Sequence, residues 1–193
     1  MCAFRQEKKY HSVYVNDYDV GADVAQLFFS RGHQKIGFIE SSVNGPNSVH
    51  RRKGFCDKCQ ELGIKIPIEW IQEANGRDFA SGYVVMEKML AIEERPTAVF
   101  INAPQLALGA VTACQDRRVL FQKELELLSV GSSKDFEYFQ PSVSIVCIPT
   151  DMIAEDSLSL LMVAIRNEIN IPVSRIVEAK YIFGATCGGV WMQ

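Results

Sequence analysis

Short β-branched runs alternate with amphipathic stretches along most of the chain. Residues 20–31 carry Val24, Leu27 and Phe28 at i, i+3, i+4 spacing, which predicts a helix with one apolar face. Residues 36–39 form a compact apolar run, which is typical of a buried strand. Because strands and helices alternate in this way, the pattern predicts a parallel sheet built from strand–helix–strand units.

The same analysis extends to the end of the chain. We expect strands over 12–15, 36–39, 69–72, 97–101, 127–130, 143–146 and 175–183. We expect helices over 20–31, 54–62, 79–93, 106–117 and 149–167. The loop 41–48 is rich in turn residues, and Asn47 or Ser48 is a suitable N-cap for the helix that follows. No internal repeat or linker interrupts the pattern, which predicts one compact unit.

Composition narrows the class of protein. Hydrophobic residues make up 48% of the 193 residues and charged residues 22%, as in an ordinary globular chain. The net charge of −3 argues against broad nucleic-acid binding, which needs clustered lysine and arginine. No apolar stretch approaches the roughly 20 residues needed to span a bilayer. The segment 1–9 turns polar at once, unlike a signal peptide, so we expect a cytoplasmic protein with no membrane partner.

The side chains offer no recognisable catalytic or metal centre. Cys56 and Cys59 have CxxC spacing, but a zinc site needs further ligands, and no second CxxC or HxxxH supplies them. We therefore expect two partly buried helix cysteines, and neither metal nor cofactor. No nucleophile–histidine arrangement or phosphate-binding glycine motif falls at a strand end, so we do not expect an enzyme. We expect His33, which joins a helix to a strand, to bond a nearby carbonyl.

Polar residues follow several of the predicted strands. In open α/β sheets, ligands bind beyond the carboxyl ends of the strands, where neighbouring loops converge. That rule selects four polar stretches, namely Asn16-Asp17, Ser41–Ser48, Asn102-Ala103 and Ser132-Ser133. Together they predict a mildly polar pocket able to hydrogen-bond a sugar, a nucleoside or a similar small polyol.

An ordered series of short motifs carries a family resemblance over residues 10–150. The motifs are Val15-Asn16-Asp17, Gly32-His33-Gln34-Lys35-Ile36, Arg51-Arg52-Lys53-Gly54-Phe55, Pro96 to Asn102, Ala107-Leu108-Gly109-Ala110 and Ser129-Val130-Gly131. In this series the chain resembles the effector-binding domain of lactose-repressor-type (LacI/GalR) transcription regulators. The resemblance implies an α/β, parallel-sheet, periplasmic-binding-protein-like (type I) fold.

The resemblance also implies which residues touch an effector. In such domains the acidic residue of a VDN segment, the arginine of RxxGF, the Asn-Asp of NDxxALGA and an aspartate after VGF contact the ligand. Carried over to this chain, these positions are Asn16, Asp17, Arg51, Asn102 and Ser133. A guanidinium at Arg51 would donate paired hydrogen bonds to a carboxylate or to vicinal hydroxyls.

This sequence departs from the family pattern at several of these positions. Asn16-Asp17 reverses the usual Asp-Asn order, Ala103 replaces an aspartate, and Ser132-Ser133 replaces an aromatic-Asp pair. The effector is therefore expected to be less hydroxylated, to carry an anionic group, or to be absent. Each residue also has a structural alternative, which leaves both interpretations open. Arg51 could pair with Asp17 or Asp57, Asn102 could cap a helix near Pro104, and Ser133 could belong to an ordinary turn.

The resemblance further implies how the domain is organised. Residues 10–193 would form one effector and dimerisation domain, in which 21–146 are mostly the C-terminal lobe, largely complete. Residues 12–15 and 149–180 would be remnants of a partial N-terminal lobe, so the chain is expected to be truncated at its N-terminus. No DNA-binding domain is expected, and DNA contact would need a helix-turn-helix that the chain lacks. The apolar face of the helix over 149–167 would then lie uncovered and favour self-association.

These inferences predict a fragment of a transcriptional regulator that senses a sugar or a related metabolite. In the intact protein a homodimer is expected to respond to this small-molecule effector. On its own, the chain is expected to bind effector weakly and to repress nothing. Two alternatives remain at this point: a degenerate gene fragment that binds no ligand, and a stand-alone solute-binding module of the same fold.

Overall fold

The computed structural model of the chain describes residues 10–43, 45–136, 138–166 and 171–188. Its centre is a six-stranded sheet with the order β3-β2-β4-β5-β6-β8. The strands are β2 (Ile36–Ser41), β3 (Ile71–Ala74), β4 (Ala98–Ile101), β5 (Glu126–Gly131), β6 (Ser144–Cys147) and β8 (Lys180–Ile182). The first five pair in parallel, and β8 pairs antiparallel to β6. The predicted parallel sheet is thus confirmed, with one antiparallel strand at its edge.

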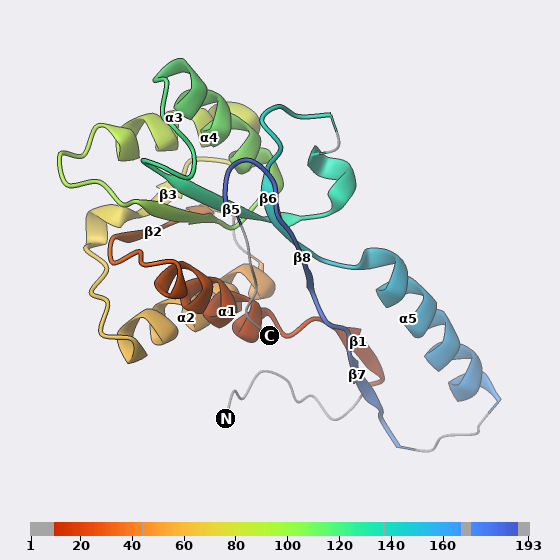
Figure 1. The fold of residues 1–193 in the computed structure, drawn as a ribbon. Helices are drawn as coiled ribbons and strands as arrows, with labels where there is room; N and C mark the ends of the chain where they lie inside the picture. Colours follow the sequence, from red (N-terminus) through yellow and green to blue (C-terminus); the bar gives the residue numbers. More distant parts are fainter. Residues whose placement is uncertain (1–9, 44, 137, 167–170, 189–193) are drawn as a thin grey trace.

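Two helices cover each face of this sheet (Figure 1). On one face lie α1 (Asp17–Ser30) and α2 (Pro46–Glu61), and on the other lie α3 (Phe79–Leu90) and α4 (Pro104–Asp116). Because successive strand residues point to opposite faces, Phe38 packs under α1 and α2 while Ile39 packs under α3 and α4. The ring of Phe38 lies 5.2 Å from that of Phe55 and 5.5 Å from that of Phe100, between centroids. Both faces of the central strands are therefore buried, as in other parallel sheets.

A smaller part of the chain lies outside this three-layer arrangement (Figure 1). Strand β1 (Ser12–Tyr14) pairs in parallel with β7 (Ser174–Ile176) in a separate two-stranded sheet. Helix α5 (Thr150–Ile165) extends away beside these strands. Of its residues, Leu160 is buried. Several large apolar side chains of α5 are exposed, namely Met152, Leu158, Leu161, Met162 and Ile165.

The predicted strand over 175–183 proves to be two strands. Residues Ser174–Ile176 form β7 in the small sheet, and Lys180–Ile182 form β8 in the large one. Between them Val177 is 4% exposed and packs into the core under α1. The apolar alternation continues through both strands, so a local pattern does not reveal that the chain passes from one sheet to another.

Most other element boundaries differ by a turn or less, but α2 begins at Pro46, about two turns before the predicted start at Gly54. Gly45 is the N-cap of α2, with Pro46 in the first turn, so the expectation of a cap at Asn47 or Ser48 is wrong. Proline is favoured in the first turn because its missing N–H would have no helical partner there. The predicted strand over 69–72 begins as a short 3-10 turn, Ile68–Trp70, before β3 starts. Among the described residues, none of the helices combines the length and apolar character needed to cross a bilayer.

Candidate functional site

Three of the predicted site residues meet at the carboxyl edge of the sheet. Asp17 starts α1 directly after β1, Arg51 lies on α2, and Asn102 follows β4. The Nε of Arg51 donates to Oδ1 of Asp17 at 2.6 Å, and a terminal nitrogen of Arg51 donates to Oδ1 of Asn102 at 2.5 Å. Nδ2 of Asn102 donates in turn to the Ser48 carbonyl at 3.2 Å. The guanidinium therefore ties together three elements that are distant in sequence.

The Asp17–Arg51 pair is largely removed from solvent. The side chains are 11% and 10% exposed, respectively. Burial raises the pKa of Asp17 above its ordinary value, because the carboxylate loses hydration, while the Arg51 guanidinium and the nearby His50 lower it in part. A buried pair of this kind is held by its geometry, because loss of either partner leaves an uncompensated buried charge.

Of the structural roles considered for Arg51 and Asn102, one is observed and two are not. Arg51 does pair with Asp17, whereas Asp57 pairs with Lys53 and accepts a hydrogen bond from the Tyr18 hydroxyl at 2.9 Å. Asn102 is not the cap of α4, because Ala103 occupies that position. The Asn102 side chain is instead committed to Arg51 and to the start of α2.

A hollow of about 190 Å³ opens beside the ion pair. Its lining combines aromatic rings with amide, hydroxyl and carboxylate groups, and consists of Ser12, Tyr14, Val15, Asn16, Asp17, Tyr18, Asn47 and His50. Aromatic walls with a few convergent polar groups are typical of small-molecule sites. This hollow is smaller than the roughly 300–1,000 Å³ that such sites usually have.

The other two predicted residues are placed differently. Asn16 lines the hollow, and its side-chain amide donates to the carboxylate of Asp19 in the first turn of α1. Ser133 is exposed at the start of a 3-10 turn, Ser133–Phe136, which follows β5. That turn is closed by the Asp135 carboxylate, which accepts from the Ser132 backbone N–H at 2.7 Å. In the described residues, no hydrogen bond connects Ser133 with the Arg51 group.

Sequence reasoning missed several side chains of the hollow, including its rings. Tyr14, Tyr18 and His50 line it but were not selected. Tyr14 precedes the selected pair Asn16-Asp17 in the sequence, Tyr18 follows it, and His50 precedes Arg51. An extension of the strand-end rule by one helical turn on α1 and α2 would have included Tyr18 and His50.

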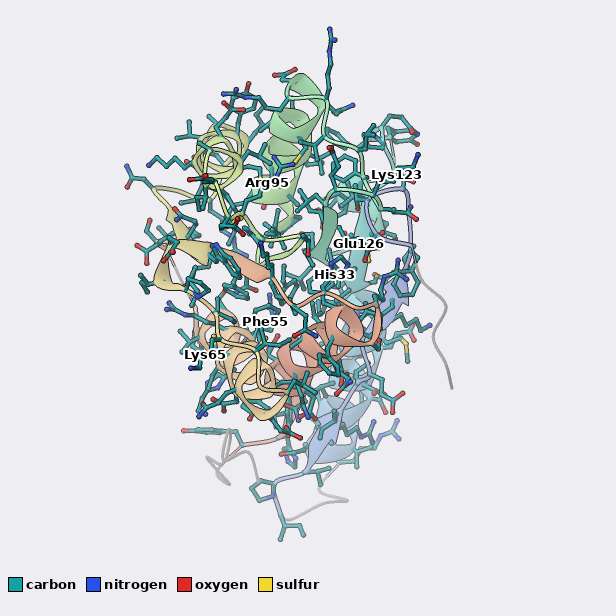
Figure 2. All side chains as sticks on the ribbon, turned by 60° about the vertical axis from the view of Figure 1, so that its left-hand side comes forward. His33, Phe55, Lys65, Arg95, Lys123 and Glu126 are labelled. Carbon is teal, nitrogen blue, oxygen red and sulfur yellow. The ribbon has the colours of Figure 1, made fainter. Side chains whose placement is uncertain are left out.

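A second buried polar group lies at the opposite, amino edge of the sheet, where Figure 2 labels His33 and Glu126. Glu126 is 4% exposed, and its carboxylate accepts from Nε of Arg31 at 2.6 Å. His33 contacts the same carboxylate through Nε2 at 3.2 Å and the Thr97 hydroxyl through Nδ1 at 2.9 Å. The expected partner of His33 was a carbonyl, so this detail was wrong.

The CxxC cysteines lie on α2 with free thiols. Cys59 is fully buried and Cys56 is partly buried. Burial raises the pKa of Cys59 to about 12, with a smaller contribution from Cys56, which makes its thiolate inaccessible at neutral pH. Within the part of the chain that the structure describes, no cluster of three or more His, Cys, Asp or Glu side chains is arranged to hold a metal ion.

Comparison with known proteins gives concordant results. A family model for the periplasmic binding protein-like domain matches residues 25–187. The HTH-type transcriptional repressor PurR of Escherichia coli O1:K1 / APEC is 28% identical over 169 residues, covering 86% of this chain and 49% of the repressor. The chain thus spans about half the length of the curated relatives it matches.

Solved structures share the fold over almost all of the chain. A LacI family transcription regulator from Clostridium acetobutylicum superimposes with a TM-score of 0.87 at 27% identity, covering 93% of this chain and 67% of that one. A LacI family transcriptional regulator from Enterococcus faecium with bound ribose superimposes with a TM-score of 0.81 at 17% identity. That match covers 97% of this chain and 69% of the other. At 17% identity it shows a shared fold only.

Proposed function

The chain belongs to the periplasmic binding protein-like family, as an effector-binding domain of the LacI/GalR regulator type, and on this premise we propose that it senses a sugar or a related metabolite. The ligand lies against the hollow at the carboxyl edge of the sheet. The Asp17 carboxylate accepts hydrogen bonds from its hydroxyls, and the Asn16 side chain bonds them as well. Arg51, which also contacts Asn102, holds Asp17 in place. Ser133 contributes from the neighbouring strand end.

The observation that carries this proposal is the contact of Arg51 with both Asp17 and Asn102. Preorganised polar groups at strand ends are what an α/β ligand site requires. Arg51 does not itself line the hollow, and its hydrogen bonds hold the Asp17 carboxylate, which does.

The proposal that the ligand is a sugar is carried over from a relative in the family. The Enterococcus faecium regulator holds ribose, and its fold matches this chain almost throughout. The tyrosine and histidine rings of the hollow suit the apolar face of a sugar ring, while Asn16, Asp17 and Asn47 suit its hydroxyls. The ligand has fewer acidic partners than usual, since Ala103 and Ser132 carry no carboxylate.

The same family membership suggests how the chain is divided between two lobes. Residues 21–146 correspond mostly to the C-terminal lobe, whose sheet is completed by β8, and β1, α5 and β7 belong to the second, partial lobe. The hollow is then one wall of a cleft between two lobes, which accounts for its small volume. In a whole regulator, ligand would favour closure of the lobes and shift a homodimer between two DNA-binding states. DNA contact would come from a segment outside this chain.

A nuclear magnetic resonance titration with ribose tests the proposal. Resonances of Asp17, His50 and Arg51 should shift, with a dissociation constant on the order of millimolar. The variant Arg51→Ala should abolish these shifts, whereas Lys65→Ala, at an exposed position distant from the hollow, should leave them unchanged. If a panel of pentoses and hexoses shifts no resonance of the hollow, the sugar-sensing function is wrong.

The same titration addresses the second candidate, a domain that binds no ligand. This alternative is favoured by one observation, namely that Arg51 is already engaged by two internal partners. If the ion pair is purely structural, Arg51→Ala should be less stable than the unmodified protein. The unmodified protein should then show no ligand-dependent shifts.

A further inference from the structure

The two helices that carry the proposed site touch each other through a pair of glycines. A Cβ atom placed on Gly21 of α1 would stand 1.9 Å from the carbonyl oxygen of Arg51 on α2. A Cβ atom placed on Gly54 of α2 would stand 1.9 Å from the carbonyl oxygen of Tyr18 on α1. Each glycine thus meets the backbone of the other helix at a residue of the site. The missing side chains allow the two backbones to approach closely.

The spacing of the ligand site depends on this crossing. Cβ atoms essentially never approach other atoms within 3.0 Å, so a side chain at either glycine would force the helices apart. The required displacement is roughly 1 Å, because the clash cannot be relieved by turning a flexible side chain. Asp17 lies one helical turn before Gly21, and Arg51 lies about one turn before Gly54. The 2.6 Å hydrogen bond between Asp17 and Arg51 bridges the same two helices.

We propose that Gly21 and Gly54 are positioning residues of the ligand site. They let α1 and α2 touch, and this contact sets both the distance between Asp17 and Arg51 and the width of the hollow. The glycines themselves touch no ligand. Functional sites require placement to within about half an ångström, so a shift of this size disables recognition. The role in ligand binding rests on the proposed function, whereas the role in positioning the ion pair can be measured without a ligand.

The opposite face of the sheet supplies a matched control. There α3 and α4 also cross through glycine, and a Cβ atom on Gly109 would stand 2.0 Å from the carbonyl oxygen of Phe79. Gly109→Ala therefore introduces the same kind of backbone clash and a comparable loss of stability. It does so in helices that carry neither Asp17 nor Arg51. Any effect specific to Gly21→Ala and Gly54→Ala then reports on the site and not on general destabilisation.

The first readout is the nuclear magnetic resonance signal of the Arg51 Nε–H, assigned by its disappearance in Arg51→Lys. The hydrogen bond to Asp17 should slow exchange of this proton with water in the unmodified protein and in Gly109→Ala. In Gly21→Ala and Gly54→Ala we expect exchange to be at least about tenfold faster, because the bond is stretched beyond hydrogen-bonding distance. Equal exchange in all four proteins would overturn the proposal.

The second readout is the ribose titration. Gly21→Ala and Gly54→Ala should weaken ribose binding at least about tenfold, whereas Gly109→Ala should leave it within about twofold. If ribose fails to bind the unmodified chain, the sugar-sensing function fails, but the Nε–H readout still decides the positioning role. If ribose binds all variants equally, the positioning role is wrong and the sensing function stands.

A measurement on the unmodified protein covers the case in which the alanine variants do not fold. If the glycine crossing holds the ion pair, the Arg51 Nε–H should exchange with water at least about tenfold more slowly than the Nε–H of Arg118, which is an exposed arginine. Equal exchange of the Arg51 and Arg118 protons would show that the ion pair is not held in the folded protein, and would overturn the proposal.

Discussion

Arg51 shows how one side chain can decide the character of a site. Its guanidinium is buried, and it bridges α1, α2 and the end of β4 through Asp17 and Asn102. Burial raises the pKa of Asp17, and the charge of Arg51 offsets only part of that effect. Arg51 therefore holds the Asp17 carboxylate in place at the edge of the hollow.

Glu126 is the buried charged residue that joins distant segments at the amino edge of the sheet. Its carboxylate accepts hydrogen bonds from Arg31 and from the thiol of Cys187, and it contacts His33. Burial by itself would raise its pKa, but these partners outweigh burial and lower the pKa to about 2. The charged carboxylate thus joins the end of α1 to the C-terminal segment.

A pH dependence of stability follows from this group. The folded pKa of Glu126 is below the ordinary value of 4.5, so its contribution is fully present above pH 4.5 and is lost as the pH falls towards 2. The shift corresponds to a contribution of about 3 kcal/mol to the free energy of unfolding. Urea unfolding at several pH values should show Glu126→Gln less stable at pH 7, with the two curves converging in acid.

Glu69→Gln, which changes an exposed carboxyl, is the control for this experiment. It should reproduce the pH profile of the unmodified protein. A profile of Glu126→Gln that stays parallel to the unmodified one between pH 5 and pH 2 would contradict the role assigned to the buried carboxylate.

Among the elements, α5 differs most from the others. Helices α1 to α4 each bury an apolar face on the sheet, whereas α5 exposes Leu158, Leu161 and Ile165 by 61%, 55% and 64%. These three residues are spaced at i, i+3 and i+7, so they share one face of the helix. The predicted uncovered face is confirmed for these three residues, whereas Leu160 of the same helix is buried.

Self-association through α5 is the expected consequence, because contiguous exposed apolar surface favours association in water. Leu161→Lys should lower the average mass in sedimentation equilibrium and change the free energy of unfolding by less than about 0.5 kcal/mol. Leu160→Ala is the matched comparison, since Leu160 is 4% exposed. That variant should lose roughly 2–4 kcal/mol of stability and leave association intact. A concentration-independent monomer mass for the unmodified chain would contradict the expectation.

At the scale of the whole molecule, the chain divides into a part whose sheet is covered on both faces and a part with an exposed helix. The six-stranded sheet has helices on both faces and two continuous apolar cores. The part made of β1, β7 and α5 has a two-stranded sheet and an exposed helix. The hollow lies where β1 leads into α1, between these two parts.

Weak ligand binding by this chain is the corresponding prediction, because one wall of the cleft is small. At about 1 mM ribose the unfolding midpoint should rise by less than about 2 °C, since stabilisation grows only as the logarithm of ligand over Kd. Differential scanning fluorimetry measures this, with Arg51→Ala as the reference that cannot respond. A ribose-specific rise of several degrees would mean that the hollow is a complete site.

Much of the fold was predictable from local pattern. The strands over 36–39, 97–101, 127–130 and 143–146 all occur within a few residues of their predicted bounds. Local periodicity reports which face of a segment is buried, and this preference is set by neighbours in the sequence. The strand-end rule likewise selected Asp17 and Asn102, and Arg51 contacts both, although Asp17 follows β1 of the small sheet and Asn102 follows β4 of the large one.

Tertiary contacts decided the rest. The division of 175–183 between two sheets, the pairing of Arg51 with Asp17 and not Asp57, and the inclusion of His50 in the hollow all depend on how distant segments meet. A periodic pattern carries no information about the separation of two helices or about the sheet that a strand joins. Those quantities arise from packing between residues far apart in the chain, such as the backbone contacts at Gly21 and Gly54.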